Sequence, residues 1–232
     1  MLNLRRILAL FVCISMLCIP VQAAEQEKLV ALTFDDGPSG RFTVRLLDGL
    51  KDRNAKATFL LCGYRMELYP RLTERIIEDG HEIGLHGYSH KSMDHMCKRD
   101  VEQEIKKSIE LLPEDYEVSF LRPPGGLYGS TVQSAALEQD LSLLHWSIDP
   151  KDWATNNAAA IKKAVLNQVR DGDVILLHDM TDSSVNAAFS IIDALQAQGF
   201  RFVTASELAK LRNITLLPGQ KYERFNKAKD VK

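Results

Sequence analysis

The chain has 232 residues, of which 45% are apolar and 26% charged, with 29 basic against 31 acidic side chains. This size and composition predict one sizeable globular domain. The nearly balanced charge lacks the basic clustering of nucleic-acid binders, so we expect no nucleic-acid partner.

The first 23 residues form a separate segment. Arg5 and Arg6 precede an apolar run over residues 7–19, and a small-residue cleavage site ends at Ala23. This pattern is typical of a secretory signal peptide, and the run is short for a bilayer span of about 20 residues. We expect cleavage after Ala23, export to the periplasm, cell wall or medium, and no membrane span in the mature chain, with an uncleaved anchor as the alternative. Without this segment the chain keeps 27 basic and 31 acidic residues, a net charge of −4.

Short apolar runs alternate with helical patterns along the rest of the chain. Several runs are rich in β-branched residues and bounded by Gly, Asp or Pro, as buried strands are. The expected strands are residues 29–34, 57–62, 82–85, 119–122, 142–148, 173–177 and 201–203. The clearest expected helices cover residues 68–76, 101–112 and 185–195. Seven such repeats predict an α/β fold with parallel strands, open or closed into a barrel.

The ends of the mature chain and its cysteines complete the organisation. We place one domain at residues 24–212 and a C-terminal tail at residues 213–232. Five of the last twelve residues are Lys or Arg, and we interpret this stretch as solvated. Cys62 and Cys97 remain after cleavage, and an exported protein allows either a disulfide between them or two free thiols.

Polar residues follow the expected strands at the point where each one ends. They are Asp35, Asp36, His86, Arg122, Asp149 and His178. Parallel sheets collect their chemistry at the carboxyl ends of the strands. We therefore expect these side chains to meet at one edge of the sheet.

A divalent metal site is the first chemistry that these residues predict. Asp35 and Asp36 are adjacent and diverge, so one can bind a metal while the other faces the reacting water. His86 and His90 are four residues apart and can be aimed at the same ion. Three protein ligands leave open positions, as in catalytic zinc sites, which activate water. The chain is thus predicted to be a metal-dependent hydrolase; for the Asp pair alone, a turn cluster is the alternative.

Other strand-end residues could support such a reaction. The imidazole of His178 titrates near neutral pH and suits protonation of a leaving group, and a carboxylate in residues 149–153 could hold it. Arg122 could pair with a carboxylate in bidentate fashion, and the N–H of Gly125 could face a developing oxyanion. The alternatives are a polar strand-end histidine and a proline-rich loop with a surface arginine.

In this order, the motifs resemble those of the polysaccharide deacetylase family over residues 29–211. The resemblance implies a distorted (β/α) barrel, consistent with about seven parallel strands. It matches Asp35 to the general base and Asp36, His86 and His90 to the metal ligands. Zinc is the default ion, and cobalt or nickel also suit one carboxylate with two imidazoles.

The resemblance also assigns the residues around the metal site. Arg122 matches the arginine that orients the base, and Asp152 matches the acid paired with the catalytic histidine, His178. Trp153 and Leu176 match positions of the substrate groove, where Leu176 lines the pocket for the acetyl methyl group.

The chain departs from the family pattern at two places. Gly87 stands where the family usually has Ser or Thr, so a hydroxyl that stabilises the loop is missing. Gly125 and Gly126 stand where an aromatic residue is common. The backbone donor of Gly125 survives, but a wall of the substrate groove is lost, and Tyr128 is our candidate to replace it.

The resemblance implies hydrolysis of N-acetyl groups on amino sugars of an extracytoplasmic glycan, with peptidoglycan as the leading substrate. An O-deacetylase of the acetylxylan type is the alternative within catalysis. A glycan-binding protein with a vestigial metal site is the alternative outside it.

Overall fold

The computed structural model describes residues 27–226, so the expected signal peptide lies outside the described residues. The strands are β1 (Lys28–Asp35), β2 (Thr58–Leu61), β3 (Glu82–Leu85), β4 (Phe120–Leu121), β5 (Ser142–Leu144), β6 (Val174–His178), β7 (Phe200–Val203) and β8 (Lys221–Tyr222). The helices are α1 (Gly40–Asp52), α2 (Gly63–Leu68), α3 (Pro70–Glu78), α4 (Lys98–Ile109), α5 (Ser130–Glu138), α6 (Ala158–Leu166), α7 (Asp182–Gln196) and α8 (Ala205–Leu211). Two 3₁₀ turns, η1 (Pro124–Gly126) and η2 (Asp152–Ala154), follow β4 and β5.

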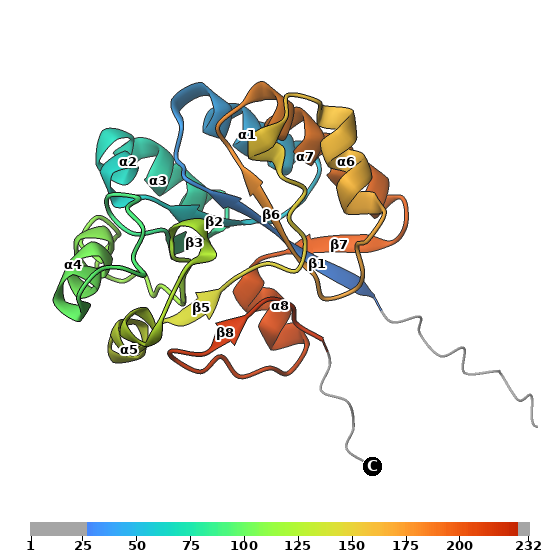
Figure 1. The fold of residues 1–232 in the computed structure, drawn as a ribbon. Helices are drawn as coiled ribbons and strands as arrows, with labels where there is room; N and C mark the ends of the chain where they lie inside the picture. The colour runs from blue at the N-terminus through green and yellow to red at the C-terminus, as the bar shows by residue number, and fades with distance from the viewer. Residues whose placement is uncertain (1–26, 227–232) are drawn as a thin grey trace, which may run out of the picture.

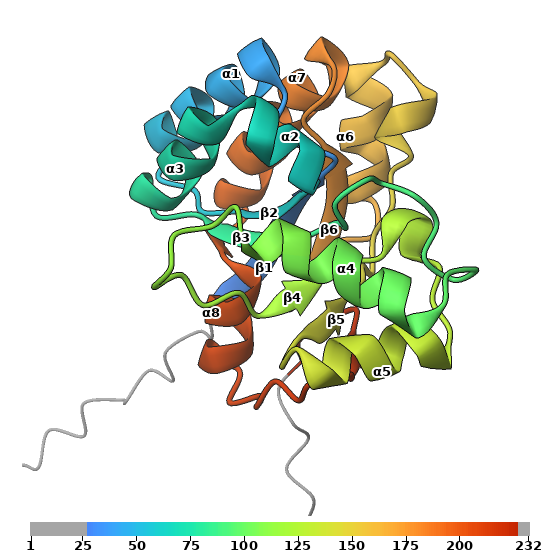
Figure 2. The same cartoon turned by 90° about the vertical axis from the view of Figure 1, so that its left-hand side faces the viewer.

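The strands form one curled parallel sheet in the order β6-β1-β2-β3-β4-β5-β8, and β7 also pairs with β1. A parallel bridge between Ile148 and Ile175 joins the segment after β5 to β6, so the ring of strands meets itself. Helices surround the outside of this ring (Figures 1 and 2). The predicted distorted (β/α) barrel is confirmed.

The alternation of side chains along β1 explains how a buried strand carries a catalytic residue. Leu29 and Ala31 belong to the smaller apolar cluster inside the ring, whereas Val30, Leu32 and Phe34 pack in the larger cluster beneath the helices. Successive side chains of a strand point to opposite faces. Asp35 therefore lies on the inner face, two residues beyond Thr33, where the ring opens.

Helix boundaries differ from the expected ones where proline intervenes. The helix expected over residues 68–76 begins at Pro70, because proline tolerates the first helical position and disfavours helical geometry in the residue before it. Leu68 instead ends α2 and is exposed. Helix α7 begins at Asp182, before the apolar pattern that starts at residue 185, because Thr181 caps it by accepting a hydrogen bond from the Ser184 N–H at 3.2 Å.

The structure corrects the expected C-terminal tail. Strand β8 pairs with β5, and Phe225 is fully buried in the inner cluster. Arg224 forms an ion pair with the buried carboxylate of Asp173. The solvated-tail interpretation is therefore wrong for residues 221–226, because an aromatic anchor and a strand pairing outweigh the polar composition; residues 227–232 lie outside the described part.

Cys62 is buried and Cys97 exposed, and both are free, so the structure matches the alternative of two thiols. Within residues 27–226, no helix is both long and apolar enough to cross a membrane.

Candidate active site

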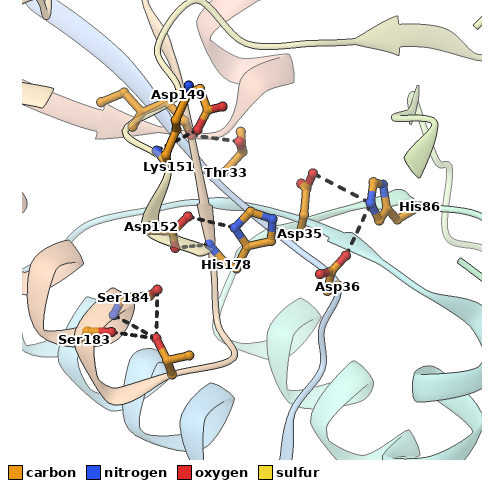
Figure 3. A network of polar contacts seen from close by, with 12 residues as sticks. Thr33, Asp35, Asp36, His86, Asp149, Lys151, Asp152, His178, Ser183 and Ser184 are labelled. Atoms are coloured by element: carbon orange, nitrogen blue, oxygen red, sulfur yellow. Dashed lines mark hydrogen bonds and ion pairs between the residues drawn. The ribbon is translucent and has the colours of Figure 1, made fainter. Parts of the chain in front are cut away.

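The strand pairing brings the polar strand ends to one edge of the sheet, as expected. Asp35 lies opposite His178 in the register between β1 and β6, and His86 and Arg122 directly follow β3 and β4. Figure 3 shows the acidic pair and the two imidazoles of His86 and His178 converging on this edge. They open into a cavity of about 350 Å³. Its lining residues are Asp35, Asp36, His86, His90, Gly125, Trp146, Asp149, Trp153, Leu176 and His178.

Asp36, His86 and His90 could hold a metal ion, since they offer ligand atoms that all lie within 4.8 Å of one another. Oδ1 of Asp36 is 2.9 Å from Nε2 of His90 and 3.4 Å from Nε2 of His86. This oxygen is buried and has no partner with hydrogen-bond geometry among the described residues. Nδ1 of His86 lies 2.6 Å from the Arg122 carbonyl oxygen, which can only accept, so Nδ1 carries the proton and Nε2 is free to ligate. The donor set fits a divalent cation.

The electrostatics of the three residues also favour a cation. Burial raises the pKa of Asp36, but His86 and His90 outweigh burial and hold that pKa well below its usual range. The contact with Asp36 in turn raises the pKa of His90. The cluster thus combines a stable carboxylate with one imidazole, that of His90, whose environment favours positive charge.

A buried carboxylate supports the turn that presents Asp36. Asp36 adopts a positive φ of 73°, and Gly37 follows it. A Cβ at Gly37 would lie 2.7 Å from Oδ1 of Asp179, so any other residue here would displace this carboxylate. Asp179 is fully buried and accepts a hydrogen bond from Thr43. Sequence analysis missed Asp179, although its place directly after His178 was a usable signal.

Arg122 is fully buried at the centre of the site, which excludes the surface-arginine alternative. One terminal nitrogen donates to Oδ1 of Asp35 at 2.5 Å and to Oγ1 of Thr33 at 2.9 Å. Nε and the other terminal nitrogen donate to the carbonyls of Leu144 and His145, both at 2.8 Å. Burial lowers the pKa of Arg122, and Asp35 opposes this shift. The guanidinium therefore fixes Asp35, whose Oδ2 lies 3.8 Å from Nε2 of His86.

His178 faces this carboxylate across the site and is held by Asp152. One Asp152 oxygen lies 2.8 Å from Nδ1 of His178, and the other accepts the His178 backbone N–H at 2.9 Å. Burial lowers the pKa of His178, but the buried Asp152 outweighs burial and raises it to about 9. His178 is thus protonated at neutral pH. Asp149 does not hold it, because its carboxylate accepts from the Lys151 N–H at 2.8 Å.

The expected groove residues are not all in the cavity. Gly125, Trp153 and Leu176 line it, and Trp153 is 65% exposed at its edge. Tyr128 is not among the lining residues; its ring lies edge-on to His145, with 5.1 Å between centroids.

Trp146 is a wall of the cavity that sequence analysis missed. Its ring stacks on His145 and lies 5.5 Å from the guanidinium of Arg122. A Cβ at Gly126, where φ is +70°, would lie 2.6 Å from the Trp146 ring. The second glycine of the Gly125–Gly126 pair therefore makes room for an aromatic wall from the segment after β5. The signal was an aromatic residue two positions past β5.

The chain belongs to the polysaccharide deacetylase family, whose model matches residues 22–144. A peptidoglycan-N-acetylglucosamine deacetylase of Bacillus cereus is 35% identical over 83% of this chain and 93% of its own length. Peptidoglycan-N-acetylmuramic acid deacetylase PdaC of Bacillus subtilis is also 35% identical, over 80% of this chain, and the chain spans only 40% of its length. A family 4 acetyl xylan esterase of Clostridium thermocellum, solved with a cobalt ion, has a TM-score of 0.79 and 34% identity, covering 85% of this chain and 98% of the esterase chain.

Proposed function

We propose that this chain is a metal-dependent hydrolase that removes N-acetyl groups from amino sugars of an extracytoplasmic glycan, with N-acetylglucosamine of peptidoglycan first among the substrates. One observation carries the proposal. An acid outside the ligand set, Asp35, and a protonated imidazole, His178, open into one cavity beside a cation-binding triad. The names of the peptidoglycan deacetylase relatives support the choice of substrate.

Asp36, His86 and His90 would hold the ion, with zinc as the default and cobalt or nickel as suitable substitutes. A divalent cation in this position supplies Lewis acidity for the attack of water on a carbonyl. The cobalt ion in the structure of the acetyl xylan esterase is consistent with this range of metals.

Asp35 and His178 would carry out the two proton transfers of the reaction. Arg122 engages Oδ1 of Asp35, which leaves the other oxygen free to take a proton from the attacking water. Gly125 lines the cavity, and its N–H would stabilise the oxygen that gains charge. His178 gives its Nε2 proton to the leaving nitrogen, while Asp152 keeps the Nδ1 proton in place. The amide C–N bond breaks, and acetate and a free amino sugar result.

Two residues that line the cavity, Trp153 and Leu176, would contact the substrate. Trp153 offers a sugar ring an exposed aromatic face, and Leu176 lies where the methyl of an acetyl group would be enclosed. Trp146, and not Tyr128, lines this cavity and would supply an aromatic wall of the groove. We extend the expected catalytic domain, residues 24–212, to residue 226, because strand β8 and Phe225 pack in the barrel. A signal peptide over residues 1–23 would precede it and direct the protein out of the cytoplasm.

The direct test is release of acetate from a panel of peptidoglycan, chitooligosaccharides and acetylxylan, with and without a chelator. We expect chelator-sensitive release from an N-acetylated glycan. Absence of release from every N-acetylated member, with an intact fold and bound metal, would refute the proposal.

Two variants test the division of roles. Asp35→Asn should abolish turnover while the metal stays bound, because Asp35 is outside the ligand set. His86→Ala should lose both metal and turnover. Metal content measured by atomic emission distinguishes them, and equal loss of metal in both would contradict the division.

The alternative is an O-deacetylase, which the similarity to an acetyl xylan esterase favours. An alkoxide leaving group needs less help from an acid than an amine does. If His178→Ala keeps most of its activity on acetylxylan, the ester is the substrate. Glycan binding by calorimetry without acetate release on any substrate would point to an inactive binding protein.

A further inference from the structure

We propose that Glu104, on α4, is a positioning residue that holds the loop between His86 and His90 so that His90 points at the cation site. The proposal rests on the metal site of the proposed function and extends it to a residue outside the cavity. Glu104 itself is partly buried and is not among the cavity-lining residues.

The carboxylate of Glu104 binds the loop by three hydrogen bonds. Its Oε2 accepts from the backbone N–H of Tyr88 at 2.8 Å and of Ser89 at 2.7 Å. Its Oε1 accepts from the Ser89 hydroxyl at 2.8 Å. Two of these donors are consecutive backbone groups, so the carboxylate fixes the course of the main chain directly before His90.

The opposite side of the loop is held by the start of α2. The N–H groups of Gly63 and Tyr64 donate to the carbonyls of Gly87 and Tyr88, at 2.9 and 3.0 Å. The peptide units of the loop are therefore clamped between two helices, with α2 binding the carbonyls and Glu104 binding the N–H groups. A buried polar network whose groups are satisfied in this way makes the loop rigid.

Gly87 explains why the support comes from outside the loop. Its φ is +74°, and a Cβ there would lie 2.6 Å from the terminal methyl of Met93 and 3.3 Å from Oε2 of Glu104. A serine or threonine at this position would be strained and would crowd its neighbours. The hydroxyl that this chain lacks, compared with the family pattern, is replaced by the longer reach of Glu104.

His90 needs this support more than His86 does. The ring of His86 is buried and anchored by the Arg122 carbonyl. The side chain of His90 is 43% exposed, its backbone has a positive φ of 57°, and within residues 27–226 no hydrogen bond fixes its second ring nitrogen. The direction of its Nε2 thus depends on the loop backbone. Residues that orient a metal ligand without touching the metal typically change affinity by about 10- to 100-fold when they are removed.

The test is a titration of the metal-free full chain with Co²⁺, followed by its visible absorption, and with Zn²⁺ against a competing chelator. The variants are Glu104→Ala, Glu104→Asp and Glu104→Gln, with Glu102→Ala as the matched control on the same helix. The side chain of Glu102 faces Lys98 at 3.8 Å instead of the loop. Thermal unfolding of each metal-free variant reports on folding separately.

Glu104→Ala should weaken metal binding by about 10- to 100-fold, and Glu104→Asp should weaken it almost as much, because the shorter side chain cannot reach both backbone N–H groups. Glu104→Gln should stay within a few-fold of the parent, since its amide oxygen can accept both N–H groups and its NH₂ can donate to Ser89. Glu102→Ala should bind metal like the parent.

The pattern of Asp against Gln remains decisive even if the alanine variant fails to fold. If Glu104→Asp keeps affinity and Glu104→Gln loses it, the charge matters and the positioning role is refuted. Parent-like affinity in both Glu104→Ala and Glu104→Asp would also refute it. The titration uses no glycan, so a chain that binds metal as described but releases no acetate would overturn the proposed function and leave this inference standing.

Discussion

Replacing Asp152 by Asn tests whether the buried carboxylate keeps His178 protonated. The change is nearly isosteric, so the cavity keeps its shape. In the parent protein, Asp152 accepts two hydrogen bonds from His178, one from Nδ1 and one from the backbone N–H. An Asn amide offers one acceptor and one donor in their place. The negative charge disappears in either orientation of the amide.

The magnitude follows from the shift that the structure produces. Burial lowers the pKa of His178, but Asp152, with smaller contributions from Asp35 and Asp36, outweighs burial and raises this pKa to about 9. Without the carboxylate, the pKa should fall to its ordinary value of about 6.5 or below. At pH 8 the protonated fraction would then drop from about 90% to about 3%, roughly a thirty-fold loss of the general acid. Activity in the parent should fall as pH rises through about 9, and in the variant this fall should begin more than two pH units lower.

The assay is acetate release from an N-acetylated glycan, with kcat measured from pH 6 to 10 at saturating metal. A titration of ¹⁵N-labelled imidazole by NMR follows the His178 proton directly. The deficit of Asp152→Asn should shrink toward the acid end of the range. An alkaline limb at the same pH in parent and variant would refute the reasoning, as would a deficit of equal size at every pH.

Three further substitutions test the walls and the C-terminal segment. Trp153→Ala should raise KM about tenfold, equivalent to about 1.4 kcal/mol of lost contact with the substrate. The melting temperature should not change, because Trp153 is 65% exposed. A change confined to kcat would contradict a role of Trp153 in the groove. Phe225→Ala should lower the free energy of unfolding by about 3–5 kcal/mol in urea titration, since Phe225 is fully buried, and an effect below 1 kcal/mol would return residues 221–226 to a dispensable tail. Gly126→Ala should destabilise the protein by about 1–2 kcal/mol because of its positive φ and should alter the fluorescence of Trp146, whereas parent-like stability and emission would show that this turn tolerates a side chain.

Local sequence patterns were enough to predict parallel strands and the edge that carries the chemistry, whereas closure into a barrel was implied by the family resemblance. β-branched apolar runs closed by Gly, Asp or Pro mark most strands within a residue or two, because a strand buried on both faces admits little else. Parallel pairing then obliges the residues after each strand to meet, which is why Asp35, His86 and His178 could be assigned to one site. Strand β8 was missed because it has two residues and little local signal; it pairs with β5 close to Phe225, which packs in the inner cluster.

What the linear chain determined by itself is the kind of chemistry: a carboxylate and two histidines at spacings that suit a cation, with a base and an acid nearby. The family resemblance paired Arg122 with the base and Asp152 with His178, but only the tertiary structure decided the burial and geometry that hold these groups. The burial of Arg122 against Asp35, the placement of Asp152 behind His178, the wall formed by Trp146 and the bonds from Glu104 to Ser89 all join residues that are distant in sequence. Such contacts depend on helix packing and strand register, which no local pattern encodes, because each arises from the sum of many weak contacts across the whole domain.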